Sequence, residues 1–148
     1  VEGVRIAADE SIRKAEDPLR VAQLGAADHI VVKVQPLGGV RAAIGVVKEC
    51  GLPATVSSAL ESSVGLSAGV ALAASLEDES AAGLGTAALL SADGVTNPLQ
   101  AREGVLPVGR VEPAQSLLEK YRAQPARAEW WVRRLRACWA RLLEGRED

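Results

Sequence analysis

The sequence predicts an α/β fold with parallel strands, and three observations indicate it. Short apolar segments recur along the first part of the chain, at Val4–Ala8, His29–Val34, Ala54–Ser58 and Ala81–Gly85. Equivalent positions near the ends of these segments are separated by 24, 24 and 26 residues, namely Asp9, Lys33, Ser57 and Gly83. A period of about 25 residues suits one strand, one helix and two loops. Each segment except the last is followed by a stretch of helical character.

The three stretches between these segments have the composition of helices. Glu16–Leu24 ends at Gly25, a common C-terminal stop. Val40–Cys50 places apolar side chains on one face and charged ones on the other, and it stops at Gly51. Ser63–Ser75 consists almost entirely of small and apolar residues, so we expect it to be packed on most of its sides.

Strand and helix alternation with continuous apolar strands favours parallel pairing. An open doubly wound sheet and a (β/α)8 barrel both satisfy it. The polar residues favour the barrel, because all four strand ends carry them and a barrel gathers such ends around one mouth. A whole barrel takes roughly 250 residues, whereas this chain has 148. We therefore expect half a barrel whose outer strands pair with strands upstream of Val1.

Composition narrows the class of protein. The chain has 48% hydrophobic and 24% charged residues and a net charge of -2, which is typical of a soluble globular protein. No run approaches the roughly 18 apolar residues of a membrane span, and the start lacks the pattern of a signal peptide. We expect a cytoplasmic protein with no membrane partner. Cys50 and Cys138 are isolated, so we expect reduced thiols, with neither a disulfide nor a zinc site.

The C-terminal tail differs from the rest in charge. From Glu119 onward it holds 8 basic and 5 acidic residues. One apolar stripe follows helical spacing, through Trp131, Leu135, Cys138 and Leu142. We expect residues 1–112 to form the partial barrel and residues 113–148 a helical tail docked on the rest of the protein. A nucleic-acid partner is not expected, because the whole chain is acidic and carries no recognition motif.

The first two strand ends carry residues suited to metal and acid-base chemistry. Asp9 offers oxygens to a hard cation such as Mg²⁺, with a helix N-cap as the alternative. Lys33 interrupts the β-branched run Ile30–Val34, where burying an ammonium group without a role is costly. We expect Lys33 to face the barrel mouth and to transfer a proton or steady an anion. The alternative is a lysine on an edge strand.

The next two strand ends carry groups that suit ligand binding. Ser57, Ser58 and Glu61 precede the third predicted helix, where hydroxyls and helix N-terminal amides can hold a carboxylate, or where they cap the helix. Gly83 lets backbone N–H groups approach a ligand closely. His29 lies at the strand end opposite the mouth, so we expect no catalytic histidine and no Ser-His or Cys-His pair.

Four motifs occur in order at these strand ends, and together they carry a family resemblance. They are Ala7-Ala8-Asp9-Glu10-Ser11, Val32-Lys33-Val34-Gln35-Pro36-Leu37-Gly38-Gly39, Ser57-Ser58-Ala59-Leu60-Glu61-Ser62-Ser63-Val64-Gly65-Leu66 and Gly83-Leu84-Gly85-Thr86. The series resembles the C-terminal half of the o-succinylbenzoate synthase family, in the muconate lactonising enzyme branch of the enolase superfamily. The resemblance implies strands five to eight of a (β/α)8 barrel, with the helical tail packing on the barrel or on an α+β capping domain.

The resemblance also implies roles for individual residues. Asp9 resembles the third ligand of an essential Mg²⁺, on the fifth strand. Lys33 resembles the sixth-strand lysine that steadies the intermediate electrostatically. Ser57, Ser58 and Gly83 match positions that line the pocket for a small-molecule carboxylate substrate.

The implied activity is that of a hydro-lyase. It is the dehydration of 2-succinyl-6-hydroxy-2,4-cyclohexadiene-1-carboxylate to o-succinylbenzoate, a step of menaquinone biosynthesis. The family's second-strand lysine and its other two metal carboxylates would lie upstream of Val1, so we expect residues 1–148 to be inactive alone, with the N-terminal half of the enzyme as the missing partner. Two alternatives stay open: an N-acylamino acid racemase or dipeptide epimerase of the same superfamily, and a non-catalytic partner or remnant half-barrel that binds another polypeptide.

Overall fold

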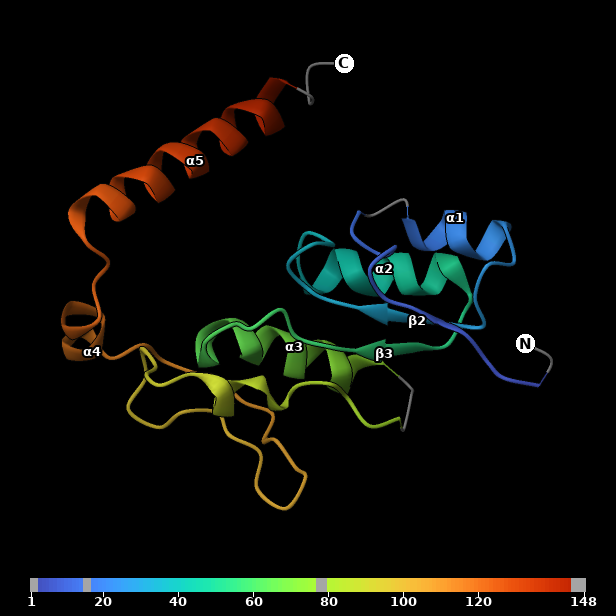
Figure 1. The fold of residues 1–148 in the computed structure, drawn as a ribbon, viewed down its shortest axis with the longest axis horizontal. Helices are drawn as coiled ribbons and strands as arrows, with labels where there is room; N and C mark the ends of the chain where they lie inside the picture. Colours follow the sequence, from blue (N-terminus) through green and yellow to red (C-terminus); the bar gives the residue numbers. More distant parts are fainter. Residues whose placement is uncertain (1–2, 15–16, 77–79, 145–148) are drawn as a thin grey trace.

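The structure is a computed structural model that describes residues 3–14, 17–76 and 80–144 (Figure 1). Its elements, in chain order, are β1 Ala7–Ala8, α1 Asp17–Gln23, β2 His29–Val32, α2 Val40–Cys50, β3 Ala54–Val56, α3 Ser63–Ser75, the 3₁₀ helix η1 Gly85–Leu89, α4 Gln115–Lys120 and α5 Pro125–Glu144. The bounds of α2 and α3 are those predicted from the sequence. Glu16, the predicted first residue of the first helix, lies outside the described residues.

The three strands form one parallel sheet in the order β1-β2-β3. Ala8 is paired with Ile30, and Val32 is paired with Val56. Strand order follows chain order, and a helix connects each strand to the next. The prediction of parallel pairing through helical crossovers is therefore confirmed.

The fourth predicted strand, Ala81–Gly85, is wrong as a strand. The structure has a single parallel bridge between Ser57 and Gly83, and η1 begins two residues later. Two backbone hydrogen bonds hold this bridge, from Gly83 N–H to the Val56 carbonyl (2.8 Å) and from Ser58 N–H to the Gly83 carbonyl (3.1 Å). The two glycines at positions 83 and 85 favour strand structure poorly, because they have no side chain to pack. Gly83 therefore pairs beside β3 as predicted, but the pairing is a single bridge rather than a strand.

The helices α1, α2 and α3 cover one face of the sheet. α1 packs against α2, and α2 packs against α3. Ile30, Val32 and Val56 are buried in one core together with Ala43 of α2 and Leu66 of α3. Their β-branched side chains suit a pleated surface between two layers. Burial of this apolar face is what fixes the register of the short strands.

The opposite face of the sheet carries the polar residues. Burial alternates along β2 and β3, with Ile30, Val32 and Val56 buried and Val31 and Thr55 only half-buried. Side chains alternate between the two faces of a strand. The residues that directly follow the three strands, Asp9, Lys33 and Ser57, therefore begin on the face turned away from the helices.

The helix α5 extends away from the sheet in Figure 1. None of its described residues is buried, and Trp131, Leu135 and Leu142 of the predicted stripe are 52%, 71% and 62% exposed. Its aromatic contacts are internal to the helix: the rings of Trp130 and Trp131 meet edge to face. Docking of this tail on the barrel or on a capping domain therefore stays a prediction.

Two further features concern the whole described chain. Cys50 is buried, Cys138 is exposed, and both are free thiols. No helix among residues 3–14, 17–76 and 80–144 has the length and apolar character needed to traverse a bilayer.

Candidate functional site

Asp9 and Lys33 meet at the C-terminal end of the sheet. Each is the first residue after its strand, β1 or β2. Continuing the β1-β2 register by one residue sets Asp9 beside Val31, and Lys33 lies two positions further on the same face. The lysine side chain spans this offset, and its Nζ donates a hydrogen bond to Asp9 Oδ1 in an ion pair.

The surroundings of this pair decide between the alternatives raised by the sequence. Asp9 caps no helix among the described residues, since α1 begins only at Asp17 and the Asp9 carboxylate accepts a hydrogen bond from Lys33. Lys33 follows the central strand of the sheet, so it is not a lysine on an edge strand. The Lys33 side chain is 21% exposed and that of Asp9 is 34% exposed. The pair is therefore partly shielded but open to solvent and to a ligand.

Ser57, Ser58 and Gly83 lie together at the end of β3. Ser57 Oγ donates a long hydrogen bond of 3.4 Å to the Gly83 carbonyl, which also accepts the Ser58 N–H. Ser58 Oγ is 2.5 Å from Thr86 Oγ1. The structure therefore brings three of the predicted ligand-binding residues into direct contact. The Thr86 hydroxyl joins this group of residues, and Thr86 belongs to the motif Gly83-Leu84-Gly85-Thr86.

Glu61 binds its own loop. Both of its carboxylate oxygens accept the Ala59 N–H, at 3.0 and 2.8 Å. The residue between them, Leu60, has a φ of 65°, a left-handed conformation that costs a non-glycine residue free energy. The Glu61 carboxylate thus holds a tight turn between β3 and α3, and its contact with a substrate stays a prediction.

Asp93 is a residue that the sequence reasoning missed. Its Oδ2 accepts hydrogen bonds from the N–H and from the Oγ of Ser63, at 2.9 and 2.6 Å, at the first residue of α3. The first amide of α3, which the sequence offered as a binding group for a substrate carboxylate, is therefore already bound to a carboxylate of the protein. The only local signal was the Asp93-Gly94 dipeptide, which indicates a turn and names no partner.

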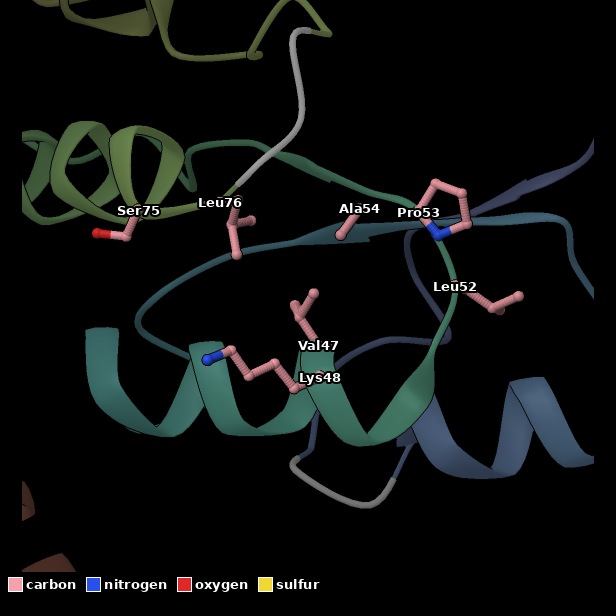
Figure 2. A pocket seen from close by; sticks show the side chains of 7 residues that line it. All are labelled: Val47, Lys48, Leu52, Pro53, Ala54, Ser75 and Leu76. Atoms are coloured by element: carbon pink, nitrogen blue, oxygen red, sulfur yellow. The ribbon is translucent and has the colours of Figure 1, made fainter.

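Two hollows of the described surface are relevant to the predicted site, and neither is lined by Asp9 or Lys33. The crevice beside Ser57, Ser58 and Glu61 is too narrow for a ligand, with a cavity volume of about 0 Å³ against the roughly 300 Å³ of a typical ligand pocket. A larger cavity of about 450 Å³ lies between the C-terminal ends of α2 and α3, lined by Val47, Lys48, Leu52, Pro53, Ala54, Ser75 and Leu76 (Figure 2). Ala54 is the first residue of β3, so this cavity is at the opposite end of the sheet from Lys33. It is lined mainly by apolar side chains.

The described residues do not form a complete metal site. Mg²⁺ takes oxygen ligands in near-octahedral geometry. Across residues 3–14, 17–76 and 80–144, the structure contains no cluster of three or more side chains of the His, Cys, Asp and Glu types that could hold an ion. Asp9 offers one carboxylate, and that carboxylate is bound to Lys33. This set of residues does not fit Mg²⁺ without further ligands.

His29 lies where the sequence placed it, at the opposite end of the strands. Its Nε2 is 2.8 Å from Thr55 Oγ1, across the β2-β3 pair. This contact links two strands near their N-terminal ends and leaves His29 away from the Asp9–Lys33 pair.

Comparison with known proteins gives consistent matches. Residues 1–113 match the family described as "Enolase C-terminal domain-like". The o-succinylbenzoate synthase of Thermobifida fusca is 54% identical over 140 residues, which cover 94% of this chain and 44% of that protein. The o-succinylbenzoate synthase of Mycobacterium tuberculosis is 46% identical over 141 residues, or 95% of this chain and 43% of that protein. The chain thus spans less than half the length of these curated relatives.

Solved structures agree on the fold. The muconate lactonizing enzyme from Pseudomonas fluorescens in complex with muconolactone superposes with a TM-score of 0.75 at 26% identity, over 81% of this chain and 35% of that one. The predicted fold class, the C-terminal half of an enolase-superfamily (β/α)8 barrel with a helical tail, is confirmed by this match and by the family match.

Proposed function

Because this chain belongs to the Enolase C-terminal domain-like family, we propose that it supplies one half of the active site of an o-succinylbenzoate synthase. The observation that carries the proposal is the Asp9–Lys33 pair at the C-terminal end of the sheet, with the Ser57, Ser58 and Gly83 cluster one strand further along. The reaction is the dehydration of 2-succinyl-6-hydroxy-2,4-cyclohexadiene-1-carboxylate to o-succinylbenzoate, in the cytoplasm and as a step toward menaquinone.

Each residue has a role that follows from its chemistry. The Lys33 ammonium lies at the C-terminal end of the sheet, and its positive charge stabilises the negative charge that develops on the substrate. The Ser57 and Ser58 hydroxyls and the backbone of Gly83 orient the substrate carboxylate. Asp9 would supply one oxygen ligand to a Mg²⁺ ion, and with further ligands in place the ion would supply positive charge to stabilise the substrate anion. The remaining ligands belong to the part of such an enzyme that this chain does not contain.

The chain alone is therefore expected to be inactive. One carboxylate binds Mg²⁺ poorly, and the proton-abstracting lysine implied by the resemblance is not among residues 1–148. The partner we propose is the remaining part of the enzyme, with its capping domain and first four strands. We also propose that α5 docks on that part, since its apolar stripe is exposed here.

A complementation assay tests the proposal. The chain is assayed with substrate and Mg²⁺, first alone and then together with the part of the Thermobifida fusca relative that it does not match, and o-succinylbenzoate is measured. We expect no turnover alone, turnover on mixing or co-expression, and loss of that turnover with Asp9→Asn or Lys33→Met. Lys48→Met is the matched control, because Lys48 is an exposed lysine at the opposite end of the sheet.

Three outcomes would contradict the proposal. The first is the absence of turnover when the two parts are mixed or co-expressed. The second is turnover by residues 1–148 alone at the rate of a complete enzyme. The third is turnover of the complemented protein that persists in both the Asp9 and the Lys33 variants. The synthase is favoured over a racemase or epimerase and over a non-catalytic half-barrel, because the curated relatives that match carry the synthase name.

A further inference from the structure

We propose that Asp93 is a positioning residue, which holds the loop of residues 57–62 in place by anchoring the N-terminus of α3. The proposal rests on the proposed function, since that loop carries Ser57, Ser58 and Glu61. Asp93 itself is not taken to touch substrate. It lies 30 residues beyond Ser63 in the sequence, in a segment without regular structure.

The contact with α3 is short and charge-assisted. Ser63 is fully buried, and both its N–H and its hydroxyl donate to Asp93 Oδ2, at 2.9 and 2.6 Å. Hydrogen bonds to an ionised carboxylate are roughly twice as strong as those between neutral groups. A negative charge at this end of a helix also interacts favourably with the helix dipole. Asp93 therefore stabilises the start of α3 in two ways.

The residues directly before α3 do not cap the helix with their side chains. The residue before α3, Ser62, makes no side-chain capping hydrogen bond, although serine is a common N-cap. Glu61 is occupied by the Ala59 N–H. The helix is thus capped by a residue from another segment of the chain, and a contact over that distance fixes where α3 begins relative to the rest of the fold.

The loop of residues 57–62, which precedes α3, is strained and is held at both of its ends. Leu60 has a φ of 65°, and a non-glycine residue keeps that conformation only where its surroundings enforce it. At the upstream end the loop is held by Ser58, whose N–H donates to the Gly83 carbonyl. At the downstream end it is held by Ser63 on Asp93. Loss of the contact with Asp93 removes the support at the downstream end of the strained turn.

The Ser63 hydroxyl connects this anchor to a further segment. While donating to Asp93, Ser63 Oγ also accepts the N–H of Leu99 at 2.7 Å. Leu99 is buried, with 8% of its surface exposed. Asp93 Oδ1 is buried and has no hydrogen-bond partner among the described residues. Burying an unpaired carboxylate oxygen raises the free energy of the folded state. A cap that served α3 alone would not require this, so we infer that Asp93 has a further role.

Amide hydrogen exchange of the whole chain tests the proposal without turnover. Asp93→Ala is expected to increase exchange in residues 57–66 at least tenfold and to leave residues 29–34 within threefold of the parent chain. Asp93→Asn keeps an oxygen acceptor toward Ser63 but loses the negative charge, so it should increase exchange in residues 57–66 less than Asp93→Ala does and leave residues 29–34 within threefold of the parent chain. Ser63→Ala keeps the backbone donor and should give an intermediate increase. Asp28→Ala is the matched control, because Asp28 Oδ2 accepts a backbone N–H from Ile6 at 2.8 Å, directly before the start of β2 rather than at the start of α3.

Three results would overturn the proposal. Exchange in residues 57–66 that is unchanged in Asp93→Ala shows that the loop does not depend on the anchor. An equal increase along the whole chain shows a general loss of stability. Exchange as fast in Asp93→Asn as in Asp93→Ala shows that the hydrogen bonds to Ser63 do not position the loop.

The complemented enzyme gives a second readout. A misplaced loop raises KM for the substrate, expected to be at least tenfold in Asp93→Ala, whereas a purely structural defect lowers the amount of active protein and leaves KM unchanged. An unchanged KM therefore counts against the proposal. If complementation itself fails, the proposed function falls, and the exchange experiment still decides whether Asp93 anchors the loop.

Discussion

Lys33 and Asp9 are 24 residues apart in the sequence, yet the lysine ammonium donates directly to the aspartate carboxylate. Adjacent parallel strands bring their C-terminal ends to the same edge of the sheet, so the first residues after β1 and β2 become neighbours. Both side chains keep access to solvent. This relationship joins the two residues that the sequence singled out for metal binding and for electrostatic stabilisation.

The ion pair is expected to contribute little to stability. Partly exposed pairs contribute about 0.2–1 kcal/mol, so the coupling energy from a double-mutant cycle of Asp9→Asn and Lys33→Met should be below about 1 kcal/mol in urea unfolding. Added salt should reduce it further, because screening weakens exposed charge pairs. A coupling energy of several kcal/mol would show that the pair is more deeply buried than the structure has it, and that its role is structural.

Gly65 is expected to tolerate no side chain. A Cβ at this position would lie 2.7 Å from Glu61 Cβ and 2.9 Å from Glu61 Cγ, so Gly65→Ala must displace the turn that Glu61 holds. We expect a loss of about 1–3 kcal/mol in unfolding free energy. Gly45→Ala in α2 is the matched control, since nothing lies within 4 Å of its Cβ position. Alanine there should stabilise the chain by up to about 1 kcal/mol, and equal effects at the two sites would contradict the assigned contact.

Asp17 is expected to titrate below its ordinary range. Hydrogen bonds from the backbone N–H groups of Arg13 and Lys14 lower the pKa of the Asp17 carboxyl below its usual 3.8. The ionised carboxylate therefore contributes stability that is present above the unfolded pKa and is lost as pH falls through the lower folded pKa. An NMR titration of the side-chain carboxyl should give a midpoint below 3.8. A midpoint at or above that value would show that the two hydrogen bonds are absent in solution.

Removal of α5 is expected to leave the free energy of unfolding of the isolated chain unchanged. No described residue of α5 is buried, and surface changes of this kind alter stability by about 0.5 kcal/mol or less. A chain ending at residue 124 should therefore unfold in urea at the same midpoint as residues 1–148. The same truncation in the complemented enzyme should lower its stability if α5 docks on the remaining part. A large loss in the isolated chain would show that α5 packs on the half-barrel itself.

Several features of the fold followed from local sequence alone. Burial of one face requires apolar residues at helical or strand spacing, and these patterns were sufficient to place α2 and α3 and the three parallel strands. The polar residues Asp9, Lys33 and Ser57 were predicted to lie near the strand ends, and each directly follows its strand in the structure, although the predicted segments ran two residues beyond β2 and β3. The segment Ala81–Gly85 was the exception, because its hydrophobic run favoured a strand while its glycines shortened the pairing to one bridge.

The contacts between distant segments were decided only by the tertiary structure. Asp93 caps α3 from 30 residues away, and Glu61 turns back onto Ala59. No sequence pattern identifies the hydrogen-bond partner of a carboxylate, because any donor that the fold brings within reach can bind it. The spacing of apolar residues in the sequence indicates which face of a helix or strand is buried, but it does not indicate which polar groups meet. The sequence by itself therefore determined which elements form and which residues end them, whereas the packing of those elements decided which polar group each carboxylate meets.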